Sequence, residues 1–265
     1  MLSKCIVYVI IFLVIGMFID THCHLFKEYY EDLDDIFTKI KNSNISSVIL
    51  NGTNGTDNKE VLETINKYDI VYGAIGIHPE FVDSITDNDF KFVEDHIKDN
   101  KIVAIGEIGL DYHYGKENRD KQIALFEKQL ALAEKLDMPV IIHSRDATED
   151  TIKCLKKFKV RGSMHSFSGS YETAMIYIKM GLLLGINGVV TFKNCNLIEV
   201  IKRIGLEHFV LETDSPYLTP VPNRGKRNDS SYINDIVDFL SNNLNISKEE
   251  IGKITSKNVS SCFDI

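Results

Sequence analysis

The sequence predicts a single (β/α)8 TIM barrel, and three observations lead to this fold class. Its 265 residues are close to the roughly 250 that one such barrel needs. Eight short, nearly continuous apolar runs alternate with amphipathic stretches of helical length. No linker or internal repeat interrupts this alternation. A doubly wound open sheet stays as the alternative, because a count of strands does not establish that the sheet closes.

The predicted strands are short runs rich in β-branched residues. They span residues 17–21, 47–51, 71–77, 103–108, 140–143, 162–165, 182–187 and 209–212. Because these runs are nearly continuous rather than alternating, both faces of each strand are expected to be covered, as in a parallel sheet.

Amphipathic patterns between the strands predict the helices. The clearest helix spans residues 119–136, where apolar residues share one face at spacings of three and four, and Pro139 follows its end. Asp146 or Thr148 is expected to cap the next helix, and Ser170 the one after it. Two helices, at about 232–243 and 247–261, are expected to end the chain.

Residues 1–16 form an apolar N-terminal extension, and the predicted barrel domain spans residues 17–265. The apolar run from Cys5 to Ile19 is shorter than the roughly 20 residues of a membrane-spanning helix, and no A-x-A-like cleavage site follows it. Its end also belongs to the first predicted strand, which a lipid-embedded helix could not supply. We therefore favour a translation start at Met17, with a membrane anchor or a cleaved signal as the alternatives.

The composition is ordinary for a globular protein and acidic overall. Hydrophobic residues make up 44%, charged residues 26%, and the formal net charge is -8. Sequence-independent nucleic-acid binders usually carry a broad basic face, so metals and a few local cations would have to hold any phosphate substrate. Five scattered cysteines without a CxxC pair indicate free thiols in a reducing compartment, hence a cytoplasmic location. No obligate protein partner is evident.

Residues that suit metal binding stand at the carboxyl ends of five predicted strands, where the active sites of such barrels lie. They are His22, His24, Glu107, His143, His165 and Asp214. His22 and His24 can reach one metal, because residues two apart on a strand point to the same face. A lone HxH pair or one acidic residue would be weak evidence. The concurrence of four imidazoles and two carboxylates at one barrel mouth predicts a metal site, since burying them without one would be costly.

Six ligands exceed what one tetrahedral catalytic zinc with an open position uses, and they suit two divalent ions about 3.5–4 Å apart. The donor set favours Zn, Mn or Co, whereas Mg prefers fewer imidazoles. A water between two such ions is acidified toward a pKa of about 7, which makes hydrolysis the expected chemistry. Asp214 is the candidate base that would take the proton of this water.

The segments that carry these residues resemble the TatD family of metal-dependent hydrolases, within the amidohydrolase-like barrels. They read FIDTHCHL (18–25), GIHP (76–79), GEIGLDY (106–112), HSR (143–145), HSFSG (165–169) and ETDSPYL (212–218), in the family's order. The resemblance covers the chain from Met17 to its end. It implies metal-dependent hydrolysis of phosphodiesters, with DNA as substrate and 3′→5′ exonuclease action often described.

The resemblance also implies how two metals would share the ligands. His22, His24 and Asp214 would hold one metal together with Glu107. The second metal would be held by His143 and His165, with Glu107 as the bridge between the two.

Three further residues are candidate substrate contacts. Arg145 follows the fifth predicted strand, and its guanidinium could clamp a phosphate oxygen, with a salt bridge to a nearby acid as the alternative. His78 and His113 lie near strand ends and could donate to substrate oxygens.

Two other functions stay open at the level of sequence. A metal-activated water attacks carbonyls as readily as phosphorus, so an amide or ester hydrolase, or a deacylase, is the alternative enzyme. A metal-bound scaffold or nucleic-acid-binding module is the alternative without catalysis. The acidic balance and the complete ligand set count against it.

Overall fold

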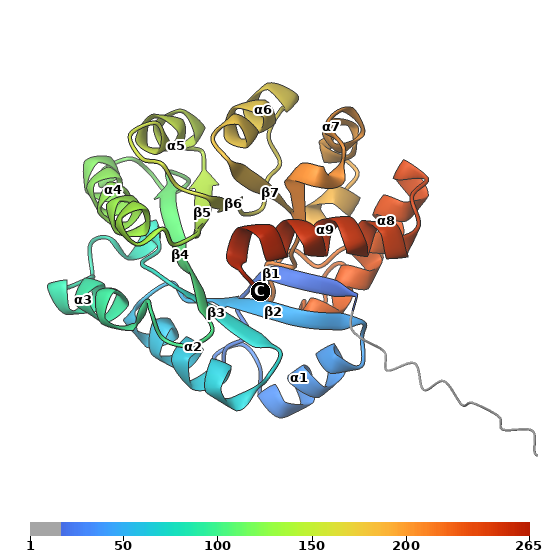
Figure 1. The fold of residues 1–265 in the computed structure, drawn as a ribbon, viewed down its shortest axis with the longest axis horizontal. Helices are drawn as coiled ribbons and strands as arrows, with labels where there is room; N and C mark the ends of the chain where they lie inside the picture. The colour runs from blue at the N-terminus through green and yellow to red at the C-terminus, as the bar shows by residue number, and fades with distance from the viewer. Residues whose placement is uncertain (1–16) are drawn as a thin grey trace, which may run out of the picture.

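The computed structural model describes residues 17–265, which form one eight-stranded parallel sheet surrounded by helices (Figure 1). The strands are β1 (Phe18–Cys23), β2 (Ile45–Asn51), β3 (Val71–Ile75), β4 (Ile102–Asp111), β5 (Val140–Arg145), β6 (Gly162–Met164), β7 (Leu182–Ile186) and β8 (Phe209–Leu211). Hydrogen-bonded neighbours follow the chain order from β1 to β8. All eight predicted strands are therefore present, with bounds that differ by at most three residues.

The first and last strands meet and close the sheet into a barrel. The backbone N–H of Asp214 donates to the carbonyl of His22 at 2.9 Å, and that of His24 donates to the carbonyl of Ser215 at 2.7 Å. Cys23 and Ser215 form a parallel bridge at the same place. These contacts confirm the predicted closed barrel and exclude the alternative, an open doubly wound sheet.

Nine helices surround or cap the barrel in the described part of the chain. They are α1 (Leu33–Lys41), α2 (Gly55–Lys67), α3 (Asp87–His96), α4 (Arg119–Leu136), α5 (Thr148–Leu155), α6 (Tyr171–Lys179), α7 (Leu197–Ile204), α8 (Ile233–Leu244) and α9 (Lys248–Phe263). Four 3-10 turns join them, at Pro79–Phe81, Gly188–Thr191, Leu206–His208 and Ser230–Tyr232.

Helix α9 covers the amino-terminal end of the barrel, the end that faces the viewer in Figure 1. Ser256 Oγ donates to the carbonyl of Met17 at 3.1 Å, and Asn258 Nδ2 donates to that of Phe209 at 2.8 Å. Phe263 is buried against apolar side chains from several strands, which are Ile19, Ile49, Ala74, Ala104, Ile141 and Val210. The opposite end, at the carboxyl ends of the strands, carries the polar residues described below.

The predicted helix caps have mixed outcomes. Ser170 caps α6 as expected, its hydroxyl accepting a hydrogen bond from the first turn. The prediction for α5 is wrong, because Ala147 holds the cap position and neither Asp146 nor Thr148 caps the helix. Asp146 instead turns its carboxylate toward His113, at 3.3 Å.

No helix among residues 17–265 is long and apolar enough to cross a membrane. The predicted apolar extension, residues 1–16, lies outside the described residues. The cysteines of the described part are free thiols, as predicted, and they are Cys23, Cys154, Cys195 and Cys262.

Candidate metal centre

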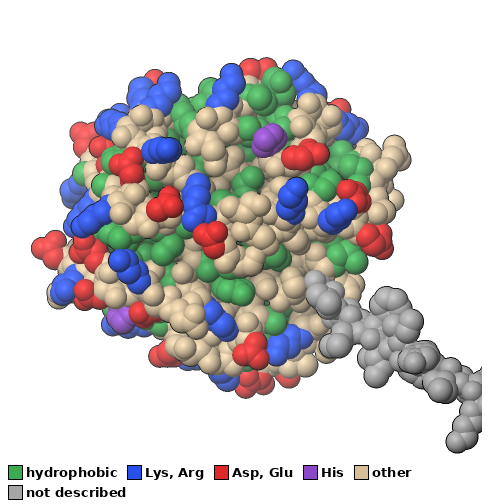
Figure 2. All heavy atoms as spheres, viewed as in Figure 1, with side chains coloured by type: hydrophobic (Ala, Val, Ile, Leu, Met, Phe, Trp, Pro, Cys, Tyr) green, Lys and Arg blue, Asp and Glu red, His purple; other side chains and the backbone are tan. Residues whose placement is uncertain are grey.

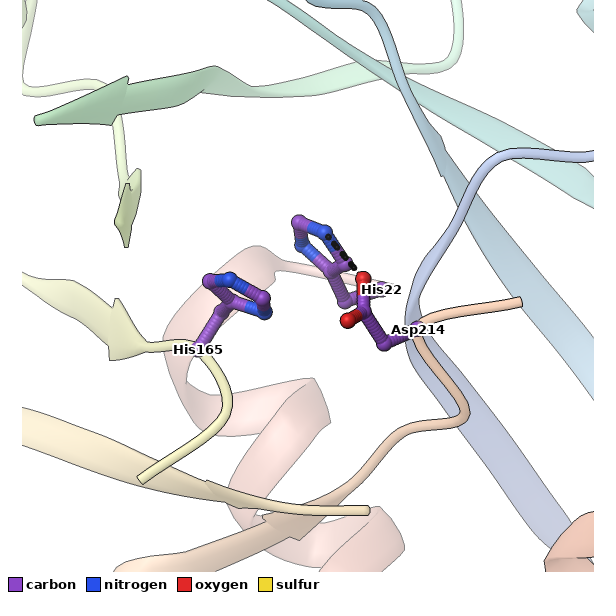
Figure 3. Close-up of side chains that lie close together, drawn as sticks. All are labelled: His22, His165 and Asp214. Atoms are coloured by element: carbon purple, nitrogen blue, oxygen red, sulfur yellow. Dashed lines mark ion pairs between the residues drawn. The ribbon is translucent and has the colours of Figure 1, made fainter. Parts of the chain in front are cut away.

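The six predicted ligands lie together at the carboxyl end of the barrel. Glu107 lies within β4, four residues before its end, and the other five come from the last residues of a strand or from the residue or loop that follows it. All six side chains are buried or nearly so. Figure 3 shows three of them, His22, His165 and Asp214, converging from different strands. The rings of His22 and His165 stack with their centroids 4.0 Å apart. Residues far apart in sequence therefore form one compact cluster.

Glu107 lies at the centre of this cluster, with one carboxylate oxygen toward each side. Its Oε2 atom is 3.4 Å from His22 Nε2 and 3.5 Å from His24 Nε2. Its Oε1 atom is 2.8 Å from His143 Nδ1 and 3.2 Å from His165 Nε2. One carboxylate thus joins two pairs of imidazoles.

The close pairing of β4 with β5 brings Glu107 beside His143. Gly109 pairs with His143 in this register, and Asp111 pairs with Arg145. Gly109 has φ +149°, and a Cβ atom there would lie 1.9 Å from the carbonyl oxygen of His143. Only glycine tolerates both the backbone angle and this approach. Gly109, the second glycine of the GEIGLDY segment, therefore allows β4 to approach β5 closely beside the cluster.

Hydrogen bonds on the outer edges of the rings fix which nitrogen faces the centre. His24 Nδ1 lies 2.9 Å from the carbonyl of Asn51, so it carries the proton and leaves Nε2 free. His143 Nε2 lies 3.0 Å from Asp111 Oδ2, which leaves Nδ1 free. His165 Nδ1 is 3.6 Å from Glu212 Oε1, and its Nε2 faces inward. In the neutral rings of His24 and His143 the inward nitrogen is therefore the one that keeps a lone pair for a metal.

Asp111 and Glu212 are functional candidates that the sequence reasoning did not assign. Both stand inside recognised segments, four residues after Glu107 and two before Asp214. Their position at strand ends was a signal that could have found them. Asn51 acts through its backbone carbonyl, which no side-chain pattern reveals.

Within the buried cluster, Glu107 and His165 stabilise each other's charged form. Burial alone would raise the pKa of Glu107, but the surrounding imidazoles, His165 and His22 first, hold it well below its usual value. Burial would lower the pKa of His165, yet Glu107 holds it well above the usual value. The pKa of His22 is lowered, chiefly by burial and then by His165. In the absence of metal, protons would have to balance the carboxylates.

The donor set fits a divalent metal on chemical grounds. Two groups of three donors, each with ligand atoms within 4.8 Å of one another, share Glu107 and are His22–His24–Glu107 and Glu107–His143–His165. Asp214 joins His22 and His165 in a third group. Imidazole nitrogens and carboxylate oxygens, free on their inward sides, are the ligands that zinc and its neighbours in the first transition row prefer.

The cluster opens into a pocket of about 720 Å³. Two of the three predicted substrate contacts, His78 and Arg145, line it, whereas His113 does not. His113 is instead half exposed beside Asp146, and its ring stands edge-on to that of Tyr114. The guanidinium of Arg145 lies 6.0 Å from the centroid of the same tyrosine ring.

His78 is prepared to donate a hydrogen bond into the pocket. Its Nδ1 atom accepts the backbone N–H of Glu80 at 3.2 Å, so the proton of the neutral ring lies on Nε2. Nε2 is 3.7 Å from Glu107 Oε1 and therefore faces the cluster. Burial, and then the nearby His143, lower the pKa of His78 to about 3. The ring stays neutral across the physiological range.

A closed (β/α)8 barrel with this buried histidine and carboxylate cluster at the carboxyl ends of its strands defines a metal-dependent hydrolase of the barrel type. The family model described as "TatD related DNase" matches residues 19–264. The chain belongs to this family of metal-dependent hydrolases.

Similar proteins agree with this membership. "Uncharacterized metal-dependent hydrolase YabD" of Bacillus subtilis is 39% identical over 254 residues, covering 94% of this chain and 100% of that protein. "Putative deoxyribonuclease tatdn3" of Danio rerio is 31% identical and covers 93% of this chain and 97% of its own length. The crystal structure of YJJV, a TatD homologue from Escherichia coli, superposes with a TM-score of 0.89 at 27% identity, covering 95% and 99% of the two chains.

Proposed function

We propose that the protein is a divalent-metal-dependent phosphodiesterase that acts on DNA, in the manner of a 3′→5′ exonuclease. The observation that carries the proposal is the position of Glu107, whose two oxygens face two separate pairs of imidazoles. The family description as a DNase and the name of the Danio rerio relative support DNA as the substrate class.

In this proposal the cluster holds two metal ions. His22, His24, Asp214 and Glu107 would hold one ion, and Glu107, His143 and His165 would hold the other. The nitrogen-rich donor set suits Zn, Mn or Co better than Mg. When bound, a pair of such ions acidifies a water and neutralises charge on the phosphoryl oxygens.

Asp214 is the proposed general base. Its Oδ1 atom lies 3.5 Å from His22 Nε2 and 3.7 Å from His24 Nε2, and the side chain lines the pocket. Burial would raise the pKa of Asp214, but the hydrogen bond from His24 and the charges of His165 and His22 lower it. The carboxylate is therefore ionised at neutral pH and can orient a water and accept its proton.

His78 and Arg145 are the proposed substrate contacts inside the pocket. The Nε2–H of His78 can donate to a phosphoryl oxygen beside Glu107. Arg145 stands two residues after His143 and can reach a phosphate with its guanidinium fork. His113 lies outside the pocket lining, so we propose for it only a contact with substrate that extends beyond the pocket, over Tyr114.

The test begins with metal analysis of the purified protein. It continues with cleavage assays on a 3′-labelled single-stranded oligonucleotide and on a panel of esters and amides. We expect bound divalent metal, release of nucleotides from the 3′ end, and little acyl hydrolysis. Ester or amide turnover without phosphodiester cleavage would instead establish the alternative enzyme on the same metals.

The paired variant His22→Ala/His24→Ala tests the ligand assignment. It should abolish hydrolysis and reduce the metal content while circular dichroism still reports a folded barrel. His96→Ala is the matched control, because His96 is a surface histidine paired with Asp99 outside the pocket. Unchanged turnover in the paired variant would refute the metal assignment.

A further inference from the structure

Aromatic side chains stand on two opposite walls of the pocket. Tyr29 and Tyr217 line the wall at the ends of β1 and β8, and Tyr114 lines the wall at the ends of β4 and β5. In a closed barrel with strands in chain order, the β8–β1 junction lies across the barrel from the β4–β5 pair. The metal-binding cluster therefore lies between the two aromatic walls.

Two of these tyrosines, Tyr114 and Tyr217, are unusually exposed for large apolar side chains. Tyr114 is 83% exposed and Tyr217 is 52% exposed. Among the described residues that are large, apolar and exposed, only two others occur, Ile176 and Val221, and neither lines the pocket. Both exposed tyrosines thus lie at the pocket, where a bound ligand can contact their rings.

The wall that contains Tyr217 is held rigidly beside the cluster. The backbone N–H of Tyr217 donates to the carbonyl of Asp214 at 2.9 Å, in a tight turn. The side-chain amide of buried Asn228 donates to the carbonyls of Thr213, at 2.9 Å, and Tyr217. Tyr29 stands edge-on to Tyr217, with ring centroids 6.0 Å apart. The backbone that carries the Tyr217 ring is thus hydrogen-bonded on both its N–H and its carbonyl, three residues after the proposed base.

The opposite wall combines an aromatic ring with a cation. The guanidinium of Arg145 lies 6.0 Å from the ring centroid of Tyr114, and both side chains line the pocket. A planar aromatic ligand can stack on either group, because guanidinium planes and tyrosine rings both accept the face of a base.

Apart from the proposed metal ions, the pocket lining offers a substrate little positive charge, which leaves a role for stacking in binding. Of the described residues that line it, Arg145 is the only lysine or arginine, against five carboxylates, Asp57, Glu80, Glu107, Asp111 and Asp214. Figure 2 shows the other end of the barrel, the face crossed by α9, where basic and acidic side chains are interspersed. The described pocket lining thus offers one cationic side chain to a polyanionic substrate, in a chain with formal net charge -8.

We infer that Tyr217, with Tyr29 behind it, and Tyr114, with Arg145, are stacking subsites for the two nucleobases that flank the scissile phosphodiester. This inference rests on the proposed function, and it adds that the enzyme recognises unpaired bases and not only the phosphate. Only bases that are unstacked from a partner strand can offer both faces to such walls.

A fluorescent reporter tests the site without requiring turnover. The chain contains no tryptophan, so Tyr217→Trp introduces a single reporter that retains an aromatic face. In the metal-loaded protein, deoxyadenosine 5′-monophosphate should quench this emission in a saturable way, whereas deoxyribose 5-phosphate should not. Equal quenching by both probes, or none, would overturn the stacking subsite.

Kinetics with a modified substrate form the second test. The probe is a short single-stranded oligonucleotide, compared with the same oligonucleotide carrying abasic sugars at the last two 3′ positions. Loss of stacking should lower kcat/KM for the wild type by about 5- to 150-fold on the abasic substrate. Tyr217→Ala and Tyr114→Ala should each reduce this preference, whereas Tyr217→Phe should keep it.

Ile176→Ala is the control for truncating an exposed apolar side chain outside the pocket, and it should keep the full preference. If the two tyrosine-to-alanine variants cleave DNA and retain the wild-type preference for bases, the stacking subsites are refuted but the proposed phosphodiesterase activity is not. Selective quenching by the nucleotide in a protein that cleaves no phosphodiester would support the subsites and refute the proposed function.

Discussion

Asp111 Oδ2 lies 3.0 Å from His143 Nε2, on the edge of the imidazole opposite to Glu107. Burial would raise the pKa of Asp111, but its hydrogen bond with His143 lowers it, so the carboxylate is ionised. A carboxylate on the outer nitrogen fixes the tautomer of a ligating histidine and strengthens its inward nitrogen as a donor. We therefore expect Asp111 to act as a positioning residue, which orients His143 toward the proposed second metal.

Asp111→Ala should weaken metal binding or activity by about 10- to 100-fold, since loss of such an outer partner typically has this effect. Asp111→Asn keeps an acceptor oxygen and should show a smaller loss. Metal content and kcat, measured across added metal concentrations, separate a binding defect from a simple loss of fold. Excess metal should restore part of the activity.

Asp99→Ala is the matched control for this prediction, because Asp99 also pairs with a histidine, His96, at 2.7 Å but on the surface. It should leave metal content and kcat unchanged. Equal effects of the two substitutions would show that Asp111 has no special role at the cluster.

Asp214→Asn should separate the role of a base from that of a ligand. The amide oxygen can still coordinate, so most of the metal content should persist, but the side chain no longer accepts a proton. We expect a fall in kcat of about 100-fold or more. Asp57→Asn provides a control, since Asp57 also lines the pocket but belongs to none of the donor groups. Activity near that of the wild type in Asp214→Asn would exclude Asp214 as the base.

The metal content of the protein should decrease as the pH falls. Burial would lower the pKa of both His143 and His165. Asp111 and Glu107 instead raise the pKa of His143 above the ordinary value of 6.5. Glu107 does the same for His165. A metal ion must displace these protons, so its affinity falls as the pH falls, beginning above 6.5. Metal content after dialysis at a series of pH values measures this. A constant content between pH 8 and pH 5 would contradict the prediction.

The barrel could be predicted from sequence because its strands are continuous apolar runs. The largest difference in strand bounds arises where β4 extends into the site. β4 continues beyond the predicted end at residue 108 to Asp111, because it stays paired with β5 through the site residues themselves. The missed α5 cap has a similar cause. Asp146 is a good capping residue by type, but its carboxylate faces His113, a contact between separate loops that no local pattern encodes.

The cluster could be predicted because its members are chemically distinctive and stand at strand ends. The outer hydrogen bonds could not be, since they depend on which ring edge faces outward in three dimensions. Asn51 contributes only a backbone carbonyl to His24. The protonation pattern of His78 depends likewise on the N–H of Glu80. Sequence reasoning therefore identifies candidate ligands more readily than the groups that orient them.

Asp20 joins the first and last strands of the barrel and should contribute strongly to stability. It is fully buried, and its carboxyl group accepts the N–H of Thr213 at 2.9 Å and that of His22 at 3.2 Å, together with the hydroxyl of Thr213 at 2.6 Å. Burial raises the pKa of Asp20 to about 7, against the lowering effect of these hydrogen bonds. The group is thus closer to neutral than an exposed aspartate would be.

Asp20→Ala would leave two buried N–H groups without an acceptor, each at a cost of roughly 1–3 kcal/mol. Its free energy of unfolding in urea should therefore fall by at least about 2 kcal/mol. Asp20→Asn keeps an acceptor oxygen and a neutral group, so its loss near neutral pH should be much smaller. If alanine and asparagine destabilise the protein equally, the hydrogen bonds to Thr213 and His22 are not what closes the barrel, and the β8–β1 junction depends on its backbone contacts alone.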